Sequence, residues 1–301
     1  MAPARIAAQH AWLGIVLAGF VAAWPVAAAP QSPQAAWKAG LAEANEAYSK
    51  TAHAILKIQD AAYLGEGDTA TLIGAKGKPA SWHWAAGETK GVLIVRYSHG
   101  HAIATMNGKT LDEKALAKSF RITPDVDIMA APTQVEAGVV GVRIFLFNQQ
   151  AKAAKDFKGL DYFPYDPSYR VTARFIPDPK LPPRVFVTSR KTSKQFYHAG
   201  DAVFMLNGKK IALPFYADDT RPISDISAFF TDDLTGRGAY GAGRYVDADP
   251  FGKYPPKTIT IDFNDAYNPN CARSAFFTCP VATDNIPVAV KAGERDPHLK
   301  H

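Results

Sequence analysis

Five polar residues near the C-terminus have the types and spacing of a binding pocket. They are Tyr240, Arg244, Asp262, Asn264 and Asn268, and they lie within 29 positions of one another. An arginine can anchor an anion through charge-assisted hydrogen bonds, while a carboxylate and two amides can orient a polar ligand. We therefore predict that these five side chains line a pocket for a small polar or anionic ligand.

The same residues also allow two other interpretations, which the sequence leaves open. In the first, Arg244 and Asp262 form an internal salt bridge, and Asn264 and Asn268 satisfy backbone groups of turns. In the second, Asp262 or Asp232 is the general base of a hydrolase, with or without the help of a metal ion. A catalytic carboxylate of this kind should have a perturbed pKa and lie in a cleft.

Motifs that are typical of cofactor or metal sites are weak here. Residues 236–241 spell GxGxxG, but no alternation of strands and helices surrounds them, so we interpret them as the connection of a hairpin. His83, His99 and His101 could supply nitrogen ligands to zinc, yet they also fit a packed strand and a polar loop. We predict no cofactor and no metal site.

Cys271 and Cys279 are the only cysteines of the chain. A close pair in an oxidising compartment favours a disulfide. Two free thiols are the alternative. A metal site is disfavoured, because no histidine lies nearby to complete a ligand set.

The elements that would position the pocket are mainly strands. Residues 258–263 read TITIDF, which predicts a strand with Ile261 and Phe263 toward the core and Asp262 and Asn264 on the opposite face. Further β-branched or aromatic runs, bounded by Gly, Pro, Asn or Asp, occur at 92–95, 139–147, 171–176, 185–187 and 203–206. Asn107-Gly108 and Asn207-Gly208 predict two tight hairpins.

One helix is expected before the strands. Residues 34–48 are rich in alanine and place Trp37 and Leu41 at helical spacing, and the helix could continue through Ile58. The chain is thus predicted to be mainly β, an antiparallel barrel or sandwich with one N-terminal helix. We divide it into a signal peptide at 1–29, a helical segment at 30–64 and a single β-rich domain at 65–295.

The charges are divided unevenly along the chain. The net charge is +6, but Lys152–Lys210 holds 12 basic and 5 acidic residues, while Asp218–Asp284 holds 10 Asp and 6 basic residues. Two solvated or mutually packed surfaces would explain the division, and so would a basic face for an anionic ligand. The modest overall excess says little about nucleic acid, and we predict no nucleic-acid partner because such a partner would be unusual for an exported protein.

The N-terminus has the pattern of a signal peptide. Arg5 precedes an apolar run at 11–23, which is followed by small residues at 26–29. The run is shorter than the roughly 20 residues that cross a bilayer, so an uncleaved anchor is disfavoured and no stable membrane insertion is expected. We predict cleavage near Ala29 and a periplasmic or secreted protein.

Several strings in the C-terminal part resemble a known family. They are FFTD at 229–232, YGAGRY at 240–245, DFNDAYNPNC at 262–271 and Cys279-Pro280. Together they resemble the bacterial exported family called domain of unknown function 1684. The resemblance implies a fold and a location outside the cytoplasm, but no reaction.

Taken together, these observations predict an exported soluble β-rich domain that binds a small polar or anionic ligand or has a structural role in the cell envelope. The alternative is an exported hydrolase with an aspartate as general base. The pattern specifies neither the ligand nor the oligomeric state.

Overall fold

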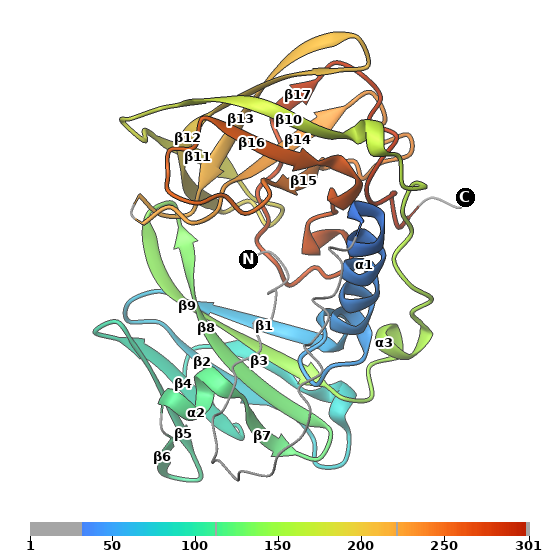
Figure 1. Cartoon of the computed structure of the whole chain (residues 1–301). Helices are drawn as coiled ribbons and strands as arrows, with labels where there is room; N and C mark the ends of the chain where they lie inside the picture. Colours follow the sequence, from blue (N-terminus) through green and yellow to red (C-terminus); the bar gives the residue numbers. More distant parts are fainter. Residues whose placement is uncertain (1–31, 112, 221, 299–301) are drawn as a thin grey trace, which may run out of the picture.

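A computed structural model of the chain describes residues 32–111, 113–220 and 222–298. Figure 1 shows two groups of β-sheets, with helix α1 (Pro33–Ser49) beside the junction between them. We call the sheets built from residues 58–148 the N-terminal sheet pair, and the sheet built from residues 170–286 the C-terminal sheet. The predicted signal peptide at 1–29 lies outside the described residues.

Helix α1 begins as its sequence requires. The hydroxyl of Ser32 accepts the N–H of Ala35 and caps the helix, and Pro33 occupies its first turn. The helix ends at Ser49, however, and Ile58–Leu64 forms strand β1. The expected continuation of the helix through Ile58 is therefore wrong. The antiparallel pairing of β1 with β9 (Val139–Asn148) decides its conformation, and a distant partner of this kind overrides local propensity.

The N-terminal sheet pair is a sandwich. One sheet has the order β1-β9-β8-β7 and the other β3-β2-β4-β5-β6, and the inner faces of both contribute to one apolar core that includes Leu72, Val95 and Ile144. The remaining strands of the pair are β2 (Thr69–Ile73), β3 (His83–Ala86), β4 (Leu93–Ser98), β5 (His101–Met106), β6 (Lys109–Leu111), β7 (Phe120–Thr123) and β8 (Val126–Glu136). Helix α2 (Glu113–Lys118) contacts β8 and β5.

The C-terminal sheet curls around a second core. Its order is β15-β14-β13-β12-β10-β16, with β11 paired to β12 and β17 parallel to β14. Beyond β15, the N–H of Asp249 donates to the carbonyl oxygen of Thr260 in β16 at 2.8 Å, so the two ends of the sheet approach each other as a half-barrel. The strands are β10 (Arg170–Pro177), β11 (Pro183–Val187), β12 (Ser193–Leu206), β13 (Lys209–Ala217), β14 (Ser227–Asp232), β15 (Arg244–Asp247), β16 (Thr258–Asp262) and β17 (Asp284–Ile286).

Contacts from helix α1 and from the outer face of β1 and β9 are among those that connect the halves. Helix α1 reaches the C-terminal half, where Trp37 Nε1 donates to the carbonyl of Asn264 at 2.9 Å. The outer face of β1 and β9 packs Phe145 and Phe147 against Phe277 from the C-terminal half. Helix α3 (Lys152–Asp156) lies in the connection between the halves.

The main expectations for the fold are confirmed. The protein is mainly β with antiparallel sheets and an N-terminal helix. Both Asn-Gly turns connect hairpins, with positive φ at Asn107 (51°) and Asn207 (49°). The GxGxxG segment connects the antiparallel strands β14 and β15, as interpreted. Within the described part of the chain, no helix has the length and apolar character needed to span a membrane.

Candidate functional site

Arg244 lies at the start of β15 with 1% of its surface exposed. Its guanidinium donates to Asp232 Oδ2 at 3.1 Å, to the carbonyl of Val290 at 3.0 Å and to the carbonyl of Ala292. Burial lowers the pKa of Arg244, and the adjacent Asp232 carboxylate opposes this shift. The expected salt bridge between Arg244 and Asp262 is wrong, because Asp232 is the acid that faces this arginine.

Asp262 belongs to a different ion pair. Arg170 of β10 donates to it at 3.1 Å and also to Asp249. Asp262 ends β16, and its carboxylate accepts the N–H of Asn264 at 3.0 Å. That hydrogen bond caps a 3₁₀ turn at Phe263–Asp265, so Asn264 does not continue the strand as the alternation predicted.

The two asparagines bind backbone groups. Asn264 donates to the carbonyl of Asp166 at 2.9 Å and accepts the N–H of the same residue at 3.0 Å. Asn268 donates to the carbonyl of Arg295 at 2.7 Å, and its own N–H donates to Glu294 at 2.8 Å. The expectation that these amides satisfy turn backbone groups is confirmed.

Tyr240 is the only one of the five predicted residues that is half-buried rather than buried. Burial raises its pKa to about 12, and the neighbouring Cys271 adds to the shift. Its ring lies 6.0 Å from that of His298.

The five residues therefore fall into three groups. Arg244 and Asn268 meet around residues 290–295, Asp262 and Asn264 meet around residues 166–170, and Tyr240 contacts the cysteines. The polar contacts described above join these side chains to other groups of the protein itself. Ligand binding by these side chains stays a prediction.

The carboxylate of Asp232 also accepts several hydrogen bonds from the protein. It accepts from Arg244, from the N–H of Val290 at 2.8 Å and from the hydroxyl of Thr235 at 3.0 Å. A general base needs a free lone pair toward its substrate. The hydrolase that we considered as an alternative thus gains no specific support from Asp232 or Asp262.

The disulfide expected between Cys271 and Cys279 is not formed, and both residues are free thiols. The N–H of Cys271 donates to Cys279 Sγ at 3.3 Å, so the pair is joined by hydrogen bonds instead. The hydrogen bond between the thiols lowers the pKa of Cys271 to about 7, and those from Ser189 and Tyr240 act in the same direction. This low pKa makes Cys271 the more nucleophilic of the two cysteines.

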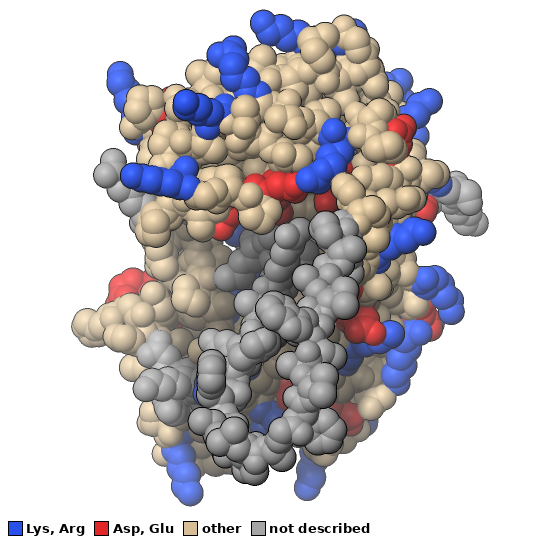
Figure 2. Space-filling model, in the orientation of Figure 1, with Lys and Arg blue, Asp and Glu red and all other residues tan. Residues whose placement is uncertain are grey.

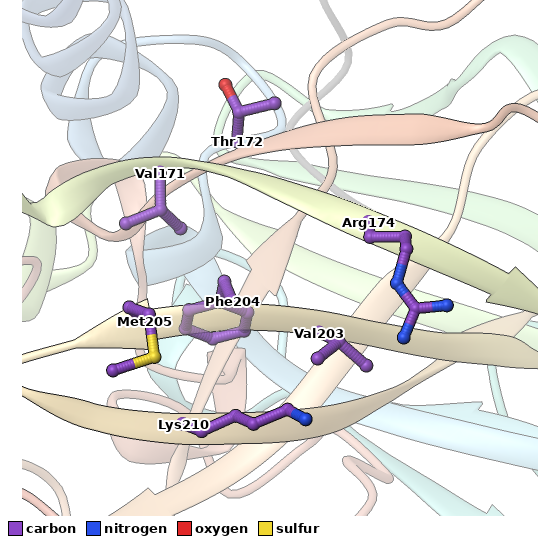
Figure 3. A pocket seen from close by; sticks show the side chains of 7 residues that line it. All are labelled: Val171, Thr172, Arg174, Val203, Phe204, Met205 and Lys210. Atoms are coloured by element: carbon purple, nitrogen blue, oxygen red, sulfur yellow. The ribbon is translucent and has the colours of Figure 1, made fainter.

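The C-terminal sheet also has a groove that was not predicted from the sequence. The ladder between β10 and β12 runs from Pro177↔Gly200 to Arg174↔Val203 and stops there, although both strands continue. Where they part, Val171 and Arg174 point from β10 toward β12, as Figure 3 shows. The groove is lined by Val171, Thr172, Arg174, Val203, Phe204, Met205 and Lys210.

This groove combines apolar surface with two cations. Met205 is 58% exposed and Phe204 forms the floor toward the core. Arg174 and Lys210 are exposed, and neither has an ion pair or a hydrogen bond with a described residue. All seven lining residues lie within the basic segment Lys152–Lys210, whose charge was the one signal in the sequence that could have found them. Figure 2 shows Lys and Arg spread over both halves of the visible face. Attraction of an anion to the groove would therefore depend on Arg174 and Lys210 themselves rather than on the positive charge of the whole face.

Comparisons with known proteins agree with the resemblance seen in the sequence. Residues 155–295 match the family described as "Protein of unknown function (DUF1684)". The chain is similar to an uncharacterized protein of Haloarcula marismortui whose structure was solved by NMR, with 32% identity over 50% of this chain and 82% of that chain, and a TM-score of 0.42. No curated protein matches the chain. The protein is thus a β-rich protein of two sheet systems, and it belongs to the DUF1684 family through its C-terminal half.

Proposed function

We propose that this protein is exported and binds a small anion with an apolar portion in the groove between β10 and β12. The observation that carries the proposal is the pair of exposed cations, Arg174 and Lys210, beside an apolar floor. An exposed cation without a carboxylate partner is free to bind a carboxylate or phosphate of a ligand. The apolar portion would cover Val203 and Met205, and each Å² removed from water would contribute about 25 cal/mol.

The proposal is tested with dodecanoate as the probe, in isothermal titration calorimetry on residues 30–301. Acetate supplies the same anion without the apolar chain, and dodecyltrimethylammonium supplies the chain with the opposite charge. We expect dodecanoate to bind at least about tenfold more tightly than either control, a difference of about 1.4 kcal/mol. Equal binding of the three probes, or no binding of dodecanoate, would contradict the proposal.

Variants locate the site. In the double variant Arg174→Gln/Lys210→Gln, the affinity for dodecanoate should fall about tenfold or more, since both anchors are lost. The matched control is Lys90→Gln/Lys109→Gln, which removes the same charge from exposed positions of the N-terminal sheet pair. An equal loss in both variants would mean that dodecanoate responds only to net charge.

Export has its own test. The full chain is produced in a bacterial host, and the periplasmic fraction is examined by mass spectrometry. We expect a chain that begins near Pro30. A protein that keeps residues 1–29 and stays in the cytoplasm would refute export without affecting the groove.

A further inference from the structure

Arg143 is a buried arginine at the junction between the two halves. It lies in β9, between Tyr63 of β1 and Ala131 of β8 in the sheet. Its neighbours in sequence, Val142 and Ile144, belong to the core of the N-terminal sheet pair. Because side chains alternate along a strand, Arg143 points to the opposite face, toward the C-terminal half. Only 9% of its surface is exposed.

No carboxylate of the described residues is paired with the positive charge of Arg143. Its Nε is enclosed without a hydrogen-bond partner, and the guanidinium forms no ion pair with any described residue. Its contacts are with aromatic rings, since Cζ lies 4.3 Å from the ring centroid of Phe145 and 5.4 Å from that of Phe277. Such contacts stabilise a desolvated cation, but they do not offset the larger cost of burying a charge without an ion pair.

A second cation reaches the same junction from the other half. Lys194 of β12 is partly buried, and it too has no ion pair within the described chain. Burial lowers its pKa, and the positive charge of Arg143 lowers it further, while the charges of Cys279 and Asp218 act in the opposite direction. On either side of Lys194, Ser193 and Gln195 bond to Glu136 and Gln134 of β8, which places this part of β12 at the junction. Each half thus contributes one cation that has no ion pair with a described residue.

The segment that contacts Arg143 has a polar group without a hydrogen-bond partner. Phe277, which stacks on Arg143, is followed by Thr278, whose Oγ1 is buried and has no partner. The Ser189 hydroxyl donates to the carbonyl of Phe277 at 3.0 Å and holds this segment against the turn that follows β11. Buried polar groups in native proteins nearly always have a partner, so this unpartnered hydroxyl is available to a bound ligand.

We propose that the junction binds a small oxyanion of the phosphate or sulfate class, held by Arg143 from the N-terminal sheet pair and Lys194 from the C-terminal sheet. A tetrahedral dianion matches two positive charges, and its oxygens accept from a guanidinium and an ammonium at once. The anion bridges the halves, so it stabilises their association. This site is separate from the groove between β10 and β12 and does not depend on ligand binding there.

The experiment uses inorganic phosphate and sulfate, with chloride as the monovalent control. Binding to residues 30–301 is measured by calorimetry, and the unfolding temperature is recorded against the concentration of each salt at constant ionic strength. We expect both dianions to bind and to raise the unfolding temperature, since a ligand of the native state stabilises it by mass action. Chloride should do neither. Equal effects of the three salts, or no binding of either dianion, would overturn the proposal.

Three variants identify the residues. Arg143→Gln and Lys194→Gln should each weaken phosphate binding about 30-fold, since each leaves the anion with a single cation. The groove variant Arg174→Gln/Lys210→Gln should keep the native affinity for phosphate. If Arg143→Gln fails to fold, the phosphate affinity of Lys194→Gln tests the site by itself. Unchanged affinity in the foldable junction variants, or a loss confined to the groove variant, would place phosphate elsewhere and refute the site.

Discussion

Arg244 and Asp232 form an ion pair at 3.1 Å whose side chains are 1% and 0% exposed. The pair joins the start of β15 to the end of β14, and through the carbonyls of Val290 and Ala292 it also holds the segment that follows β17. Three parts of the C-terminal half thus meet at one guanidinium. Its Nε is enclosed without a partner, so the other donors carry the whole interaction.

Loss of this arginine should be costly. Arg244→Met leaves the carboxylate of Asp232 buried without its cation, and we expect the free energy of unfolding to fall by about 3–5 kcal/mol. The measurement is the urea midpoint at pH 7. The control is Arg96→Met, which breaks an exposed pair with Glu88 and should cost less than about 1 kcal/mol. Similar losses in the two variants would show that burial does not govern the Arg244 pair.

Two glycines in the connection between β14 and β15 provide a second test. Gly243 has φ of +87°, and a Cβ there would lie 2.4 Å from Ala282 Cβ and 2.7 Å from the carbonyl oxygen of Phe230. Gly243→Ala should destabilise by about 2–4 kcal/mol, from left-handed backbone strain and overpacking. A Cβ at Gly241 meets nothing within 4 Å, so Gly241→Ala should change stability by less than about 0.5 kcal/mol. The unfolding temperatures of the two variants test this prediction. If Gly241→Ala is the more damaging one, the described packing is wrong.

Asp247 should make stability depend on pH. Burial raises its pKa, although the hydroxyls of Ser227 and Tyr267 donate to it and oppose the shift. A carboxyl with a raised pKa favours the native state below its unfolded pKa of about 3.9, and this contribution disappears as the pH rises through the folded pKa. Both hydroxyls donate to Oδ1, an atom that asparagine keeps.

We therefore expect Asp247→Asn to be more stable than the native protein at pH 8, with a difference that shrinks toward pH 4. Urea midpoints of both proteins across this range measure the difference, and groups common to both proteins cancel. A difference that stays constant with pH would mean that Asp247 is not the titrating group. A difference that grows as the pH falls would have the wrong sign.

The thiol of Cys271 should react at neutral pH. The hydrogen bond from Cys279 lowers the pKa of Cys271 to about 7, so its alkylation by iodoacetamide should be half-maximal near pH 7. In Cys279→Ala the midpoint should move up toward about 8.5, the value of an unperturbed thiol. Peptide mass spectrometry identifies the alkylated residue. A native midpoint near 8.5, or the same midpoint in both proteins, would contradict the proposed hydrogen bond.

Local structure could be predicted where neighbouring residues determine it. The Asn-Gly turns formed because these two residues accept positive φ with little strain, and TITID formed β16 because its alternation matches a strand with one apolar face. The predicted continuation of the helix beyond Ser49 was wrong. Residues 58–64 are decided by pairing with β9, which lies about 80 positions away in the chain.

The candidate site was harder to predict because pairing partners depend on the path of the chain. Arg244 lies 12 residues from Asp232 and 18 from Asp262, and spacing alone does not choose between these acids. The choice follows from β14 and β15 being paired neighbours in the sheet. Arg143 could have been noticed as a lone charge within the apolar run 139–147, but only its burial against Phe277 distinguishes it from a solvated arginine.

The sequence by itself determined the mainly β class, the N-terminal helix and the tight turns, since these depend on periodicity and on the backbone preferences of neighbouring residues. It also carried the strings that mark the family. The tertiary structure alone decided which acid each arginine faces, where β10 and β12 part, and which cations lack a partner. These features depend on distances between segments that are separated along the chain, and such distances exist only after the chain has folded.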